Sequence, residues 1–166
     1  MLCCLERSNS PNTFVLTCCW NLPIEQSDGV GMTKILLVED SKFLRMATER
    51  ALARAGYAMI TAADGVHALE LAKREKPDLI LLDMLLPRMT GPDVLKALKK
   101  NDATKGIAVV AFTGLSAKNA DRLRMDGVCA FLDKSELGLD KGCETLLQAI
   151  AEILKNLKVG AAAGGD

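Results

Sequence analysis

The sequence has few aromatic residues and no excess of charge of either sign. Of its 166 residues, 4% are Phe, Trp or Tyr, and 21 Lys and Arg residues balance 21 Asp and Glu residues. A chain without net positive charge has no general attraction for nucleic acid or for an anionic membrane. A chain with so few rings also offers no surface on which single-stranded bases could stack. We therefore expect no direct contact with nucleic acid.

Long hydrophobic runs are also missing. The longest candidate, residues 14–20, is far shorter than the roughly 20 residues that span a bilayer. Glu6 lies where a signal peptide would be basic, and no small-residue cleavage pattern follows the apolar run. We expect a soluble, cytoplasmic protein that makes no membrane contact.

The cysteines do not follow a metal-binding pattern. Four of the six form adjacent pairs near the start of the chain, Cys3 with Cys4 and Cys18 with Cys19. Adjacent cysteines lack the spacing of a zinc site, and the single histidine, His67, lies far away in the sequence. We interpret them as reduced thiols of a cytosolic protein, and His67 as an exposed residue of a helix.

The middle of the chain alternates between apolar runs and helical patterns. Strands are predicted at residues 35–38, 57–62, 79–82, 107–112 and 128–132, and helices at 41–54, 64–76, 91–99, 116–125 and 141–157. The first helical pattern places Phe43, Leu44, Ala47, Ala51 and Leu52 along one side. Five strand–helix units predict an α/β fold, a doubly wound five-stranded parallel sheet with helices on both faces.

Both ends of the chain differ from this pattern. Residues 1–31 have no sustained period, whereas Met32 opens a stretch that is typical of a domain start. We hypothesise that Met32 is the native initiator, and that residues 1–31 are a mis-called extension or a disordered arm. The main domain is then expected at residues 32–158, followed by a flexible tail of small residues at 159–166. No linker to an output module follows the last predicted helix.

Polar residues follow four of the predicted strands. They are Glu39 and Asp40, Asp83, Thr113 and Lys134. Because the carboxyl ends of parallel strands meet at one edge of the sheet, we expect these side chains to converge there. Three clustered carboxylates need a compensating cation, and an all-oxygen ligand set suits Mg²⁺. An aspartate in such a site can accept a phosphoryl group, with a lysine and a hydroxyl holding its oxygens.

Each of these residues alone has a simpler explanation. Asp40 could be a helix cap, Asp83 and Thr113 could form turns, and Lys134 could be a solvated surface charge. Their placement at the ends of four different strands is what indicates a site.

With these motifs in place, residues 33–158 resemble the receiver domain of bacterial two-component response regulators. The matching stretches are residues 35–40, 77–87 together with Gly91, 111–114 and 127–134. The resemblance implies a flavodoxin-like fold with strand order 2-1-3-4-5. It also implies a stand-alone, single-domain signalling module rather than an enzyme that releases a product.

The resemblance further implies a role for each site residue. Asp83 would be the phosphoacceptor, and the ligands of Mg²⁺ would be Asp40, Glu39 through water, Asp83 and the backbone carbonyl of Leu85. Thr113 and Lys134 would contact the phosphoryl oxygens, and Phe131 would be the switch aromatic that turns inward as the threonine hydroxyl moves.

The implied partners are proteins. A histidine kinase would donate the phosphoryl group, and a downstream target or a histidine phosphotransfer protein would respond to it, with the domain a monomer or a phosphorylation-dependent dimer. Leu85 and Leu115 are apolar where relatives face the attacking water, which predicts slow loss of the phosphoryl group.

Two alternatives stay open. An aspartate-nucleophile phosphatase would need a second aspartate where this chain has Leu85, which argues against that class. The second alternative is a degenerate receiver that binds partners without phosphorylation. The intact set of acidic residues argues against it.

Overall fold

The computed structural model describes residues 32–114, 120–135 and 144–162 of the chain. In chain order the elements are β1 Lys34–Val38, α1 Lys42–Arg54, β2 Ala58–Ala62, α2 Gly65–Glu75, β3 Leu79–Leu82, α3 Gly91–Lys100, β4 Ala108–Thr113, α4 Ala120–Met125, β5 Ala130–Asp133 and α5 Glu144–Ala162. The predicted alternation of strands and helices is confirmed. The predicted extension at residues 1–31, Leu115, and the predicted helix starts at residues 116 and 141 lie outside the described residues.

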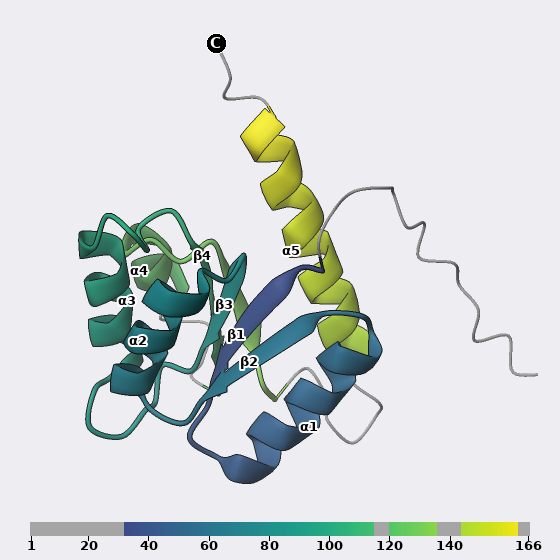
Figure 1. Cartoon of the computed structure of the whole chain (residues 1–166), viewed down its shortest axis with the longest axis horizontal. Coiled ribbons are helices and arrows are strands. Elements are labelled where there is room, and N and C mark those ends of the chain that lie inside the picture. Colours follow the sequence, from purple (N-terminus) through teal and green to yellow (C-terminus); the bar gives the residue numbers. More distant parts are fainter. Residues whose placement is uncertain (1–31, 115–119, 136–143, 163–166) are drawn as a thin grey trace, which may run out of the picture. The chain divides into compact units, whose positions relative to one another are not determined.

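The strands form one parallel sheet in the order β2-β1-β3-β4-β5 (Figure 1). This confirms the predicted doubly wound fold and its strand order. The order reverses between β1 and β3, and a doubly wound sheet binds its ligand at the carboxyl ends of the strands at such a reversal. We therefore expect the ligand site at the loops that follow β1 and β3.

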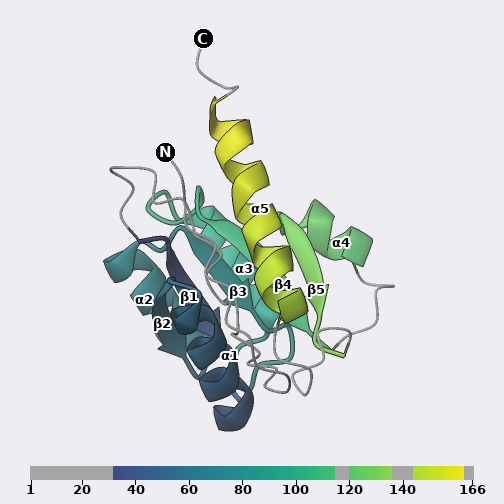
Figure 2. The same ribbon diagram turned by 90° about the vertical axis from the view of Figure 1, so that its right-hand side faces the viewer.

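Helices cover the sheet on both faces. Helices α2, α3 and α4 lie on one face and α1 and α5 on the other, as the two views show (Figures 1 and 2). Alternate residues of β1 enter the two cores: Leu36 and Val38 pack toward α2 and α3, and Ile35 and Leu37 pack toward α1 and α5. The central strands are apolar throughout because both of their faces are buried.

Helix α1 differs from the sequence prediction in which side it buries. Leu52 is buried, but Phe43, predicted on the same side, is 77% exposed. The two residues are nine positions apart, which at about 100° per residue places them on opposite sides of a helix. The buried stripe instead runs through Thr48 and Leu52, one turn apart.

Helix α5 continues to Ala162, beyond its predicted end at Leu157 and into the predicted tail. Alanine has the highest helix propensity, and Ala161 and Ala162 offset the cost of Gly160. Among the helices of the described ranges, none is long and apolar enough to cross a membrane. His67 is exposed on α2, as predicted.

Gly91, the first residue of α3, lies against the loop that follows β3. Its N–H donates to the carbonyl of Met84 at 3.3 Å. A Cβ atom at this position would collide with the carbonyl oxygen of Asp83 and lie 2.5 Å from the Cα atom of Met84. Only glycine lets α3 begin this close to Asp83.

We predict that Gly91→Ala shifts the Asp83 loop and lowers the free energy of unfolding by about 1–3 kcal/mol, the usual cost of overpacking. Urea unfolding measures the change. Gly106→Ala is the matched control, since a Cβ atom there meets nothing within 4 Å and its effect should stay within about 0.5 kcal/mol. Equal stability of the two variants would contradict the prediction.

Candidate functional site

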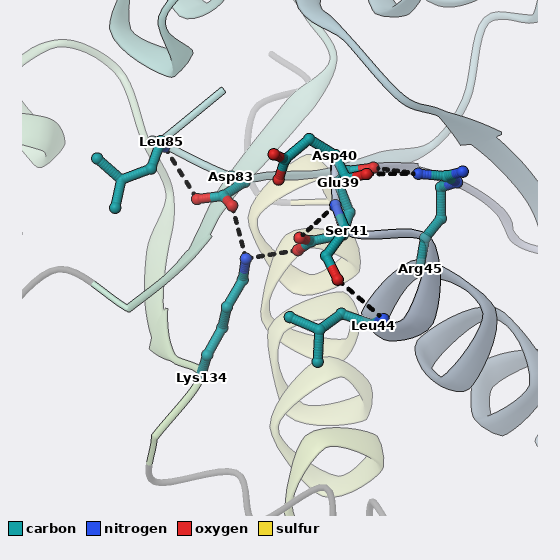
Figure 3. A network of polar contacts seen from close by, with 8 residues as sticks. All are labelled: Glu39, Asp40, Ser41, Leu44, Arg45, Asp83, Leu85 and Lys134. Carbon is teal, nitrogen blue, oxygen red and sulfur yellow. Dashed lines mark hydrogen bonds and ion pairs between the residues drawn. The ribbon is translucent and has the colours of Figure 1, made fainter. Parts of the chain in front are cut away.

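The predicted site residues do meet at the carboxyl edge of the sheet. Glu39 and Asp40 follow β1, Asp83 follows β3, Thr113 ends β4 and Lys134 follows β5. The ligand oxygens of Glu39, Asp40 and Asp83 lie within 4.8 Å of one another. Figure 3 shows the carboxylates of Glu39 and Asp83 in contact with the ammonium of Lys134, with Asp40 beside them.

Lys134 bridges the two buried carboxylates. Its Nζ atom lies 2.6 Å from Oδ2 of Asp83 and 2.5 Å from Oε2 of Glu39. The side chains of Glu39, Asp83 and Lys134 are 1%, 6% and 14% exposed. Water screens such buried charges poorly, so each carboxylate depends strongly on this one ammonium.

The positive charge of Lys134 does not fully offset the burial of Glu39. Burial raises the pKa of the Glu39 carboxyl above its ordinary value of 4.5, and the charge of Asp83 acts in the same direction. The ion pair with Lys134 and a hydrogen bond from the N–H of Ser41 lower that pKa in part. The cluster therefore favours additional positive charge.

Asp40 supplies the exposed side of the cluster. Its alternative role as a helix cap is not what the structure has, because the hydroxyl of Ser41 caps α1 by accepting from the N–H of Leu44 at 3.4 Å. The carboxylate of Asp40 faces solvent beside two buried carboxylates. An oxygen-only set of this kind fits a hard divalent cation such as Mg²⁺.

The other predicted site residues are Leu85, Thr113 and Phe131. The N–H of Leu85 donates to Oδ1 of Asp83 at 3.0 Å, which keeps the backbone of Leu85 next to the cluster. The Leu85 side chain is exposed, Thr113 is fully buried, and the carbonyl of Thr113 accepts from the N–H of Lys134 at 3.1 Å. Phe131 is partly buried against the core beneath α2, α3 and α4. These placements leave the predicted ligand role of the Leu85 carbonyl and the predicted switch role of Phe131 as predictions.

Arg45 is a site residue that the sequence analysis missed. Its Nη1 atom donates to the carbonyl of Glu39 at 2.7 Å and to the carbonyl of Asp40 at 3.2 Å (Figure 3). The guanidinium thereby holds the backbone that carries both acidic side chains. Arg45 lies within a helix and not at a strand end, but an arginine one turn beyond the capping Ser41 is a signal that could have identified it.

Comparison with known proteins agrees with this geometry. Residues 35–146 match the family model of the response regulator receiver domain. The polar-differentiation response regulator DivK of Brucella anthropi is 39% identical over 102 residues, which cover 60% of this chain and 82% of that protein.

Solved structures with the same fold include receiver domains of bacterial proteins. The signal receiver domain of a putative LuxO repressor from Vibrio parahaemolyticus matches with a TM-score of 0.68 and 31% identity, covering 82% of this chain and 100% of that one. The receiver domain of the sensor histidine kinase PA1611 from Pseudomonas aeruginosa matches with a TM-score of 0.57 and 28% identity, covering 68% and 98%. That structure has a magnesium ion coordinated in its active-site cleft.

The raised pKa of Glu39 predicts how pH affects stability without a divalent cation. The folded protein binds the Glu39 proton more tightly than the unfolded chain, so this group contributes stability that is complete below pH 4.5 and is lost as pH rises through the folded pKa. We expect the unfolding free energy of the wild type to fall relative to that of Glu39→Gln as pH rises through this range.

Urea unfolding of both proteins in EDTA, at a series of pH values, measures this difference. Taking the difference removes the contribution of carboxylates that do not interact with Glu39. A difference that does not change with pH would contradict the prediction.

Proposed function

Because this chain belongs to the response regulator receiver domain family, we propose that it is a phosphoacceptor switch in which Asp83 accepts a phosphoryl group from a histidine kinase. The observation that carries the proposal is the buried cluster in which Lys134 and a neighbouring carboxylate face Asp83 at the sheet edge. Receiver domains are signalling modules, so the product is a protein state rather than a released metabolite.

The residues fit a Mg²⁺ site. Asp40, Asp83, the carbonyl of Leu85 and, through water, Glu39 would hold the ion. Bound Mg²⁺ would neutralise negative charge where the phosphoryl oxygens approach. The burial of Glu39 with a raised pKa supports this assignment, because the cluster lacks compensating positive charge.

In the proposed transfer, a carboxylate oxygen of Asp83 attacks phosphorus. The bond from that oxygen to phosphorus forms as the bond from phosphorus to the imidazole nitrogen of the donor histidine breaks, and the leaving imidazole keeps the electron pair. Lys134 and the hydroxyl of Thr113 hold phosphoryl oxygens as negative charge develops. Gly114 supports this arrangement, since even a Cβ atom there would meet nothing within 4 Å.

The exposed side of α1 supports a protein as the phosphoryl donor. Phe43 is 77% exposed and Met46 is 38% exposed, and their spacing of three places them on one side of the helix. This helix begins two residues after Asp40, so the apolar side chains lie on an element that adjoins the acidic edge. A cytoplasmic location is part of the proposal.

The output would follow from movement at Phe131. When the Thr113 hydroxyl turns to the phosphoryl group, Phe131 would move inward and change the surface near β5. A downstream target or a histidine phosphotransfer protein would read that change, with the domain acting as a monomer or as a phosphorylation-dependent dimer.

Acetyl phosphate with Mg²⁺ tests the proposal. We expect an acid-stable, base-labile phosphoprotein that is absent in EDTA and absent in Asp83→Asn. Asp102→Asn is the control, because the Asp102 side chain is 92% exposed on another loop, and it should label as the wild type does. Labelling that persists in Asp83→Asn would contradict the assignment. Failure to label with both acetyl phosphate and histidine kinases would favour a receiver that acts without phosphorylation.

Leu85 leads to a prediction on the lifetime of the phosphoryl group. Its side chain is 59% exposed beside Asp83 and cannot orient an attacking water by hydrogen bonding. We expect Leu85→Asn to lose its phosphoryl group several-fold faster than the wild type, because the amide can position that water. Decay of the phosphoprotein after removal of the donor measures the rate. Val66→Asn, at a 54% exposed position of α2, should leave the rate unchanged, and an equal rate in Leu85→Asn would count against the idea.

A further inference from the structure

Phe112, near the end of β4, contacts Lys134 in addition to the residues already described. The Nζ atom of Lys134 lies over the ring of Phe112, 5.3 Å from its centroid. This is within the roughly 6 Å at which an ammonium is attracted to the negative face of an aromatic ring. The ring is 1% exposed, so it is held firmly by its surroundings.

The position of Phe112 in the sheet explains how the ring reaches Lys134. Phe112 pairs with Leu132 of β5, and Lys134 follows this strand with its N–H on the carbonyl of Thr113. Phe112 and Thr113 are neighbours in one strand, so their side chains point to opposite faces of the sheet. Phe112 packs in the core beneath α1 and α5. Lys134 is thus bounded by a fixed ring as well as by Asp83 and Glu39.

The ring contact differs from the ion pairs in one respect. The attraction of Lys134 to Glu39 and Asp83 weakens when a cation or a proton neutralises those carboxylates. The attraction to the ring of Phe112 does not depend on their charge, and it is strongest for an ammonium shielded from water. With 14% of its side chain exposed, Lys134 is largely shielded.

We propose that Phe112 is a positioning residue for Lys134: its ring holds the ammonium beside Asp83 when the carboxylates are neutralised and no longer hold it themselves. This inference rests on the proposed role of Lys134 in phosphoryl transfer. In that role the ring limits the positions that the ammonium of Lys134 can take while it contacts the incoming phosphoryl oxygens.

Fluorinated phenylalanines at position 112 test the proposal in the full chain. Replacing Phe112 with 4-fluoro-, 3,5-difluoro- and 3,4,5-trifluorophenylalanine keeps the shape of the ring nearly constant while it removes negative charge from the ring face. Phe112→Leu removes the ring and keeps an apolar side chain. Trifluorophenylalanine at Val66, which is exposed on α2, is the control.

The first measurement is NMR of the lysine side chains, in EDTA and in saturating Mg²⁺, with Lys134 assigned by comparison with Lys134→Arg. We expect the ring-current shift of the ε-protons of Lys134 to persist in wild-type protein with Mg²⁺. We also expect it to decrease stepwise along the fluorine series in Mg²⁺ more than in EDTA. A ring-current shift of the Lys134 ε-protons in Mg²⁺ that does not change along the fluorine series would overturn the proposal.

The second measurement is the rate of phosphorylation by acetyl phosphate at saturating Mg²⁺. We expect a progressive loss that reaches about five- to tenfold in the trifluoro protein and a similar loss in Phe112→Leu, the size expected of a shielded cation–π contact. If Phe112→Leu is phosphorylated slowly while the trifluoro protein is phosphorylated at the wild-type rate, Phe112 acts through packing alone and the proposal is overturned.

The two measurements separate this inference from the function on which it rests. If wild-type protein takes up no phosphoryl group, the proposed function fails, and the NMR series still decides whether the ring positions Lys134. If wild-type protein is phosphorylated but neither the NMR shift nor the rate follows the fluorine series, only the role of Phe112 fails.

Discussion

The site depends on one buried ammonium shared by two buried carboxylates. Removing Glu39 and Asp83 from water is costly unless an opposite charge lies close by, and Lys134 supplies a single positive charge for both. Asp40 adds a third carboxylate at the exposed side. Burial and the neighbouring charge of Asp83 raise the pKa of Glu39, so the incomplete pairing favours a bound cation at the site.

The surrounding structure serves to hold these charges at fixed distances. The sheet is apolar on both faces, so polar side chains enter the site only where strands end. Arg45 then fixes the backbone after β1, and the missing side chain of Gly91 lets α3 begin against the backbone of Asp83. An acidic cluster that would otherwise separate by repulsion is therefore held by its backbone as well as by Lys134.

Two phenylalanines with proposed roles pack on opposite faces of the sheet. Phe131 packs on the face beneath α2, α3 and α4, and Phe112 packs on the face beneath α1 and α5. In the proposed mechanism Phe131 responds to the hydroxyl of Thr113, and Phe112 positions the ammonium of Lys134.

The sequence alone determined the order of the elements, the parallel sheet and the residues at the strand ends, because buried parallel strands are apolar runs whose ends are marked by the first polar residue. Only the tertiary structure decided that Phe43 is exposed, that Arg45 binds the backbone after β1, and that Lys134 lies over Phe112. Those features depend on how a helix is rotated against the sheet and on distances between residues far apart in the chain, such as Asp83 and Lys134, which are separated by 51 positions. The local helical period separates Phe43 from Leu52 but does not say which of the two is buried, because that is set when the two cores pack.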